Sequence, residues 1–453
     1  MNNMGSSDEE DILLLDPEDL RNLALNRRSL TSRLLSIPTS ILVLFKVILR
    51  ILFVLLNNIY CIPTYAVWMV ILAPLKRYHP ELYWRIEGTF FHWLLAMVSM
   101  WSWSAGYDIV EVGDDIRRCT EDRTLVIANH QSTADVPMLM ATFNPRANVL
   151  PNIMWIMDRV FKFTNFGFVS VIHEDFFILS GRHHRDTAVL KLKKHIRDSY
   201  IPLNRKLMVL FPEGGFLRKR REVSQRYALK NNLPVLNHVS LPRMGAMQGI
   251  VDVCGCQSDQ VSPNNNTDVK SSGDDNSVSN EISPPPEDMS AVAPSNTNFS
   301  QENTPIDKTS EITPITTNPP KDLEVKADYQ LRWVLDITIA YPEGKPLDLP
   351  TIITGWRKPC QTFMFYRLYP GSQIPTDTEE LTKWLITRWQ EKEQILSTFY
   401  STGQIPVSEY CSSPIPPQTV LQDPLRFFLL HVFFLTSSYL HFRIFTFLLA
   451  TIW

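Results

Sequence analysis

The sequence predicts an α/β domain with a mixed sheet and flanking helices, joined to membrane-embedded helices before it and a membrane segment after it. Short apolar strands alternate with helical segments through the middle of the chain, which is the pattern of an α/β core. Long apolar runs occupy residues 38–106 and 425–453, and about 20 apolar residues suffice for a helix to cross a bilayer.

The bulk composition gives no case for a nucleic-acid partner. The chain has 453 residues and a net charge of −3 at pH 7, so no excess of positive charge favours DNA or RNA. Six cysteines are scattered without metal-ligand spacing, and only Cys254 and Cys256 lie close together. We therefore expect free thiols in a reducing compartment and no metal site. The sequence does not identify a protein partner.

The ends of the chain and its polar tract suggest a domain organisation. Residues 1–37 are expected to form a cytosolic tail, because their acidic start lacks the positive charge that opens a signal peptide. Residues 257–326 are rich in Ser, Asn and Pro and poor in aromatic residues. Such a composition predicts a disordered acidic insertion. It would interrupt one domain, formed by residues 107–256 and 327–424.

The apolar region before the domain contains three runs, at residues 41–57, 60–75 and 89–106. The first two could form one span with a re-entrant piece, or a two-helix hairpin. Lys46 and Arg50 interrupt the first run at helical spacing, which indicates a helix lying partly in the interface with snorkelling side chains. The alternative is a buried hairpin of a soluble protein, which the length of the apolar stretch disfavours.

Period-two apolar patterns and short apolar runs place the elements of the domain. Strands are expected at residues 107–112, 124–128, 155–157, 169–172, 206–210, 236–241, 333–341 and 361–369, and helices at 185–200 and 379–400. Ser132 or Thr133 is expected to cap a helix that carries Asp135 in its first turn.

His130 and Asp135 lie five positions apart where the strand at 124–128 gives way to that helix. A carboxylate that accepts one imidazole N–H fixes the tautomer, and the other ring nitrogen can then take a proton from an alcohol. The pair therefore predicts acyl transfer to a hydroxyl, with backbone N–H groups near Ser132 and Thr133 as candidate oxyanion donors. The alternative is a histidine in a loop and an aspartate that starts a helix.

A second motif supports the catalytic interpretation. Phe211-Pro-Glu213-Gly214-Gly215 leaves a strand and enters a glycine turn whose backbone amides could face phosphates. Four basic residues from Arg218 onward could contact phosphates or anionic headgroups, or could form a solvated charged face. Glu213 could hold a substrate hydroxyl or a backbone group.

These motifs resemble two conserved blocks of the glycerophospholipid acyltransferase family, which includes the 1-acylglycerol-3-phosphate acyltransferases. Residues 167–182 are similar to the acceptor-phosphate block, and Leu241-Pro242-Arg243 is similar to the block that contains a proline. The runs at 162–167, 175–178 and 211–221 look most like the lysophosphatidylglycerol acyltransferases. The resemblance covers most of the chain and continues at 336–341 and 356–359.

The resemblance implies an acyltransferase-type fold and an enzyme of phospholipid remodelling. A fatty acyl group would pass from acyl-CoA, as co-substrate and without cofactor or metal, to a lysophospholipid such as lysophosphatidylglycerol. The site would face the cytosol in an endoplasmic-reticulum membrane protein, and membrane phospholipids would be its partners. His130 and Asp135 would be catalytic. The substrate would be bound by Glu213, Gly214, Gly215, Arg182, Arg185, Arg218 and Pro242.

Two departures from the family pattern bear on the acceptor. Gly215 stands where the family usually has a threonine, and three residues separate Phe177-Ile178 from Arg182. Arg185 therefore competes with Arg182 for the acceptor phosphate. Other open interpretations are the same chemistry on lysophosphatidylethanolamine, lysophosphatidylinositol or monoacylglycerol, or a catalytically silent lipid-binding scaffold.

Overall fold

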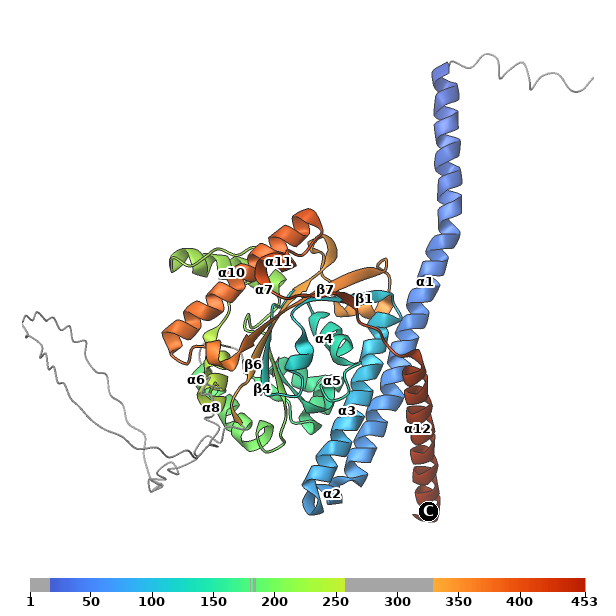
Figure 1. Cartoon of the computed structure of the whole chain (residues 1–453). Coiled ribbons are helices and arrows are strands. Elements are labelled where there is room, and N and C mark those ends of the chain that lie inside the picture. The colour runs from blue at the N-terminus through green and yellow to red at the C-terminus, as the bar shows by residue number, and fades with distance from the viewer. Residues whose placement is uncertain (1–16, 180, 182–184, 257–328, 453) are drawn as a thin grey trace, which may run out of the picture. The chain divides into compact units, whose positions relative to one another are not determined.

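A computed structural model describes residues 17–179, 181, 185–256 and 329–452 (Figure 1). The expected disordered insertion lies outside the described residues. Within them, strands form one sheet in the order β4-β3-β5-β2-β6-β7-β1-β8. In chain order the strands are β1 (Tyr107–Gly113), β2 (Thr124–Ala128), β3 (Ile153–Asp158), β4 (Phe176–Ile178), β5 (Leu207–Leu210), β6 (Trp333–Ala340), β7 (Cys360–Pro370) and β8 (Ile415–Thr419).

The sheet is mixed, which confirms the predicted fold class. The five strands from β4 to β6 run parallel to their neighbours, and β1 runs parallel to β7. The β6–β7 and β1–β8 pairs are antiparallel. Strand β6 pairs directly with β2, with Thr124 opposite Trp333. The chain before residue 257 and the chain after residue 328 therefore complete the same sheet.

Helices cover both faces of the sheet, so its central strands are buried on both sides. In β2, Val126 and Ala128 belong to one hydrophobic cluster, whereas Leu125 and Ile127 belong to the other. This double burial explains why the strand is a continuous apolar run. The flanking helices are α4 (Asp135–Phe143), α5 (Asn165–Ile172), α6 (Arg185–His195), α7 (Leu217–Lys230), α8 (Met244–Cys254), α9 (Leu349–Thr354), α10 (Thr378–Thr402) and α11 (Val407–Tyr410).

One polar pair crosses from the sheet to α10. Lys392 Nζ lies 2.5 Å from Asp336 Oδ1 and donates to the Ile337 carbonyl at 2.6 Å. Both side chains are almost completely buried. A buried charge needs a partner, because desolvation of a lone charge is costly. The pair therefore fixes the register of α10 on β6.

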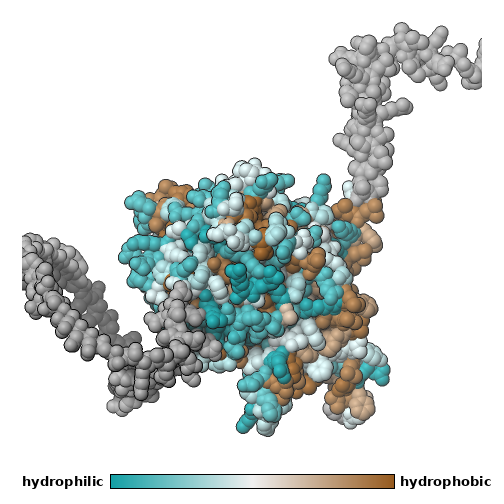
Figure 2. Space-filling view, in the orientation of Figure 1, coloured by the Kyte–Doolittle hydropathy of each residue, from teal (hydrophilic) through white to brown (hydrophobic). Residues whose placement is uncertain are grey.

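Two helices are long and apolar enough to cross a membrane by length and composition. They are residues Ser40–Ile71 of α1 (Pro17–Ile71) and residues Pro424–Thr451 of α12 (Pro424–Ile452). Figure 2 shows hydrophobic residues gathered along the side that these helices occupy. The first apolar run and most of the second thus lie in one continuous helix. After α2 (Ala73–Tyr78) the chain turns back into α3 (Pro80–Trp103), which carries most of the third run and packs against the core.

Arg50 has a different role from the predicted snorkelling to phosphates. Its guanidinium donates to the carbonyls of Ile352 and Ile353 at the end of α9, and to the Trp101 carbonyl at 2.8 Å. Carbonyls at a helix end lack partners within the helix, so a cation there satisfies them. Arg50 therefore joins α1 to α3 and α9 rather than to headgroups.

Two predicted strands are wrong, and local side-chain contacts explain both. Residues 169–172 lie in α5, which begins because Thr164 Oγ1 accepts the Gly167 N–H at 3.0 Å. Residues 236–241 form no regular element, because side chains take their N–H groups. Glu393 accepts from the N–H groups of Asn237, His238 and Val239 at 2.8, 2.7 and 3.2 Å. Other side chains accept the N–H groups of Ser240 and Leu241.

Candidate active site

The chemistry-bearing motifs meet at one edge of the sheet. His130 follows β2, and Glu213 follows β5, which lies parallel to β2 in the sheet. Carboxyl ends of neighbouring parallel strands lie at the same edge, where open α/β sheets place their sites. The loop after β2 also contacts the turn after β5, since the Leu217 N–H donates to the His130 carbonyl at 2.8 Å. The two motifs, about eighty residues apart in sequence, therefore form one site.

Asp135 orients the His130 imidazole. Its Oδ2 lies 2.9 Å from His130 Nδ1 and accepts the Ser132 N–H at 2.9 Å. Its Oδ1 accepts the Tyr341 hydroxyl at 2.7 Å. The carboxylate is fully buried at the first residue of α4. A carboxylate only accepts, so the Nδ1 position carries the proton and the Nε2 lone pair is left for a substrate.

The His130 ring lies between two phenylalanines. Phe211 stacks on it with ring centroids 4.2 Å apart, and Phe216 meets it edge-on at 4.5 Å. Its side chain retains 12% exposure, and Nε2 has no hydrogen-bond partner among the described residues. The imidazole is thus fixed in position but reachable, which is the geometry a general base requires.

The Glu213 carboxyl supports the backbone at the site. It is fully buried, and it accepts the His130 N–H at 3.0 Å and the Ser240 N–H and hydroxyl at 3.1 and 2.7 Å. Trp389 Nε1 donates to it at 3.3 Å. Burial raises the pKa of Glu213 above its ordinary value, and the hydrogen bonds oppose that shift. With both oxygens engaged, this carboxyl joins the backbone of His130 to the backbone of Ser240.

The glycine turn makes room for an arginine. Gly214 and Gly215 have φ of 66° and 153°, which favour glycine. A Cβ at Gly215 would lie 3.3 Å from Cδ of Arg220, whose stem crosses the turn. Arg220 is half-buried, and its Nε has no hydrogen-bond partner among the described residues. Glycine at position 215 therefore leaves space for the Arg220 stem, which brings a half-buried positive charge to the turn.

The remaining predicted residues have different placements. Arg218 is exposed on α7, whereas Pro242 is partly buried next to Arg243, whose N–H donates to the Pro212 carbonyl at 2.8 Å. Arg182 lies outside the described residues. Arg185 begins α6, and its side chain is not among those described.

Two expectations about the loop after His130 are corrected. The cap position of α4 is Ala134, without a side-chain cap. The Ser132 hydroxyl donates to the Leu347 carbonyl, and Thr133 Oγ1 accepts the Leu349 N–H at 2.9 Å. The Ser132 N–H is already bound to Asp135, so it is not available to an oxyanion. These side chains hold the loop against the segment before α9 instead of starting α4.

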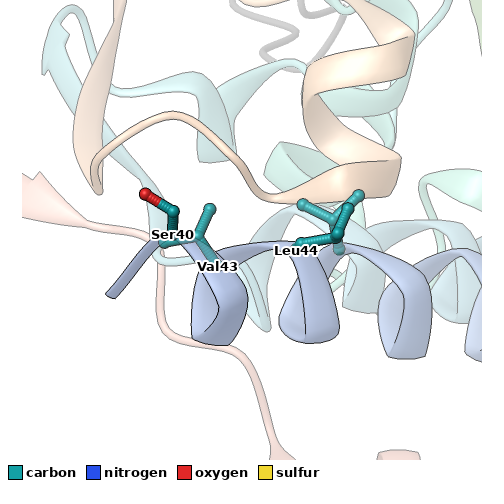
Figure 3. Close-up of a pocket in the computed structure, with 4 residues that line it drawn as sticks. Ser40, Val43 and Leu44 are labelled. Atoms are coloured by element: carbon teal, nitrogen blue, oxygen red, sulfur yellow. The ribbon is translucent and has the colours of Figure 1, made fainter. Parts of the chain in front are cut away.

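A hollow of about 390 Å³ lies elsewhere, along α1. Figure 3 shows Ser40, Val43 and Leu44, which line it with Val47. All four residues come from a single helix, so no second wall encloses a ligand. None of the residues with acid–base chemistry lines this hollow, and the site at His130 is the better candidate.

Sequence reasoning missed Tyr341 as a site residue, and it named Arg220 only as one of four basic residues that could contact phosphates. Tyr341 follows β6, the other neighbour of β2, so the topology brings it to the same edge. Burial raises the pKa of Tyr341 well above its ordinary value, so its hydroxyl remains a donor. A tyrosine directly after a predicted buried strand was an available signal for the first. For Arg220, the signal was its place in the basic run that follows the glycine turn.

Comparisons with known proteins agree with this site. The profile described as "Acyltransferase" matches residues 109–240, and "Acyltransferase C-terminus" matches residues 351–435. Acyl-CoA:lysophosphatidylglycerol acyltransferase 1 of Homo sapiens is 38% identical over 401 residues, which cover 88% of this chain and 94% of that protein. The protein of the same name from Mus musculus is 39% identical over 88% of this chain and 93% of its own length.

A more distant relative matches a smaller region. Lysocardiolipin acyltransferase 1 of Gallus gallus is 38% identical over 82 residues, or 18% of this chain and 21% of that protein. No solved structure matches. The fold, the His130 site and the long matches place the chain in the acyltransferase family.

Membership of this family makes the chain an acyltransferase enzyme, with lysophospholipid acyltransferases among its relatives. A catalytically silent scaffold is not favoured.

Proposed function

We propose that the chain transfers a fatty acyl group from acyl-CoA to the free hydroxyl of a lysophospholipid, with lysophosphatidylglycerol as the preferred acceptor. The observation that carries this proposal is the open Nε2 of His130, whose ring is fixed by Asp135. The names of the two relatives that match most of the chain support the donor and the acceptor. The enzyme is further proposed to lie in the endoplasmic-reticulum membrane with its site toward the cytosol.

The reaction follows from the groups at the site. His130 Nε2 takes the proton of the acceptor hydroxyl while the oxygen attacks the thioester carbonyl. The tetrahedral intermediate then collapses, the C–S bond breaks, and the imidazolium returns the proton to the leaving thiolate of CoA. Asp135 stabilises the imidazolium between these steps. General-base catalysis of this kind contributes about 10²–10⁴-fold to the rate.

The substrate's phosphate is proposed to lie over the Gly214–Gly215 turn. Backbone amides of such a turn can face an anion, and the Arg220 guanidinium supplies a half-buried positive charge next to it. Arg218 is exposed one turn away and is proposed to contact a phosphate nearer the solvent. Arg182 and Arg185 remain proposed ligands of the acceptor phosphate.

Acyl transfer by the purified chain in phospholipid vesicles tests this function. The protein is incubated with radiolabelled oleoyl-CoA and with lysophosphatidylglycerol, lysophosphatidylethanolamine, lysophosphatidylinositol or monoacylglycerol. We expect His130→Ala to abolish transfer, while His79→Ala, at an exposed histidine between α2 and α3, keeps it. Wild-type transfer by His130→Ala would refute the mechanism, and preference for another acceptor would refute the assigned headgroup.

The location is tested separately. An epitope placed within residues 257–326 should colocalise with an endoplasmic-reticulum marker and be digested by protease added to sealed microsomes. Protection of the epitope in sealed vesicles would contradict the cytosolic orientation.

A further inference from the structure

An exposed apolar strip lies on the segment that follows β3. This segment, called here the η4–α5 segment, consists of the 3-10 turn η4 (Arg159–Phe163) and α5. Val160 is 72% exposed and Phe163 is 79% exposed. Phe161, Phe168 and Val171 are also exposed. Large apolar side chains gathered on one surface segment mark an interaction site rather than ordinary surface.

The strip adjoins the membrane helix α1. Asn165 Nδ2 at the start of α5 donates to Asn58 Oδ1 at 3.0 Å. Asn58 lies well inside the apolar stretch Ser40–Ile71. Just beyond α5, Glu174 forms an ion pair with Lys76 of α2 at 3.2 Å. The segment is therefore fixed beside α1 at a level where Leu55, Leu56 and Ile59 of that helix are exposed.

The composition of the segment suits the boundary between headgroups and acyl chains. Arg159 and Lys162 are exposed among the apolar residues, and basic side chains favour anionic headgroups. Phenylalanine and other large apolar residues form the buried face of helices that lie in this boundary. A 3-10 turn would leave backbone groups unsatisfied deep in hydrocarbon, so shallow insertion fits better than full burial. Continuity with α1 favours lipid over a protein partner.

The segment also lies at the catalytic edge. Strand β3 pairs in parallel with β5, which pairs in parallel with β2. The carboxyl ends of these three strands share an edge, so η4 starts at the edge that carries His130 and Glu213. A membrane contact here would present that edge to lipids.

We propose that the η4–α5 segment is a bilayer contact, in which Val160, Phe163 and Phe168 insert shallowly beside α1 and hold the catalytic edge against the membrane. The contact does not depend on which lysophospholipid is acylated. Its consequence is that a lipid acceptor reaches His130 from the bilayer rather than through water.

Photo-crosslinking to lipid tests the proposal without relying on activity. The photoreactive residue p-benzoylphenylalanine replaces Phe163 in the full chain, which is reconstituted in vesicles that contain tritiated phosphatidylcholine. The matched control carries it at Tyr227, which is 57% exposed on the highly charged helix α7. The positive control carries it at Leu44, on the exposed apolar face of α1.

We expect the Phe163 variant to take up several-fold more lipid label than the Tyr227 variant, and to approach the Leu44 variant. Equal labelling at 163 and 227, with strong labelling at 44, would overturn the proposal. If the Phe163 variant fails to reconstitute, the same substitution at Val160 gives the same readout. Because lipid labelling does not require acyl transfer, a failure here is distinguishable from a failure of the proposed function.

Discussion

The substitution Asp135→Asn separates two roles that the carboxylate plays toward His130. One role is to fix the proton on Nδ1, and the other is to supply negative charge when the ring becomes an imidazolium. In the structure, Oδ2 accepts from both His130 Nδ1 and the Ser132 N–H, whereas Oδ1 accepts only from Tyr341. An asparagine has a single oxygen, so its orientation decides whether the tautomer survives.

The contacts favour one orientation of the new amide. The Ser132 N–H can only donate, so the amide oxygen belongs at the Oδ2 position. The amide NH2 then faces the Tyr341 hydroxyl, which can accept and turn its own proton toward Ser132. The Nδ1–H tautomer of His130 is thereby retained. In this variant, His130 loses only the negative charge that the Asp135 carboxylate supplied.

The lost charge sets the size of the effect. A hydrogen bond to a charged group contributes about 1.5–3 kcal/mol and a neutral one about 1. The difference of about 0.5–2 kcal/mol lowers kcat about 2- to 30-fold. Loss of the base, in His130→Ala, should lower it by the full 10²–10⁴ or so. In the Asp135→Asn background, Tyr341→Phe should cost about 1–3 kcal/mol of stability, because the amide NH2 loses its acceptor.

Initial rates of acyl transfer from radiolabelled oleoyl-CoA to lysophosphatidylglycerol, at saturating substrates, provide the assay. His130→Ala is measured alongside as the reference for complete loss of the base. If Asp135→Asn is as inactive as His130→Ala while thermal unfolding is unchanged, the amide has flipped and the argument from Ser132 is refuted.

Three further predictions rest on buried groups of the core and the turn. Gly215→Thr places a side chain at a residue with a φ of 153° and against the Arg220 stem. We expect about 1–3 kcal/mol of strain and a lower kcat/KM, and unchanged kinetics would contradict this. Lys392→Met leaves Asp336 buried without its partner and should lower the unfolding free energy by about 3–5 kcal/mol. Its control, Lys383→Met, breaks an exposed pair and should change stability by no more than about 0.5 kcal/mol; equal losses in chemical denaturation would refute the reasoning. Burial raises the pKa of Glu213. Between the ordinary carboxyl pKa and this raised pKa, the folded state therefore binds more protons than the unfolded state. The free energy of unfolding should therefore fall as pH rises from about 4 toward that raised pKa. In Glu213→Gln, the melting temperature should decline less over this pH interval, because the carboxyl is gone. An identical pH profile in the variant would contradict the assignment.

Much of the sheet was predictable because its strands carry their own signal. The β2 strand Thr124–Ala128 is buried throughout and apolar from Leu125 onward, as burial on both faces requires. The strand predicted at 236–241 has a weaker apolar pattern, and its conformation depends on Glu393, which lies far along the chain in α10. Contacts between residues so distant in sequence leave no periodic trace.

The same contrast applies to the site. His130 and Asp135 are close in sequence, so their spacing alone predicted a hydrogen bond. The sequence left Glu213 open between a substrate hydroxyl and a backbone group, because its partners Ser240 and Trp389 reach it only after the sheet and α10 have assembled. Burial of a carboxyl is a tertiary property, and the structure shows the contact of this residue with the His130 backbone directly.

Residues 257–328 connect two points of the described chain that lie next to each other, so the length of this connection has little effect on stability. Gly255 and Leu331 share a backbone hydrogen bond of 3.2 Å, and Cys256 forms a bridge with Leu331. Whatever connects these two points needs only to return to its start, and each doubling of such a loop costs only about 0.6 kcal/mol. Leu331 precedes β6, which runs parallel to β2, so this junction lies at the sheet edge opposite His130. A reporter domain or a tether could therefore be spliced in here, and natural variation in length could accumulate, with the acid–base pair left undisturbed.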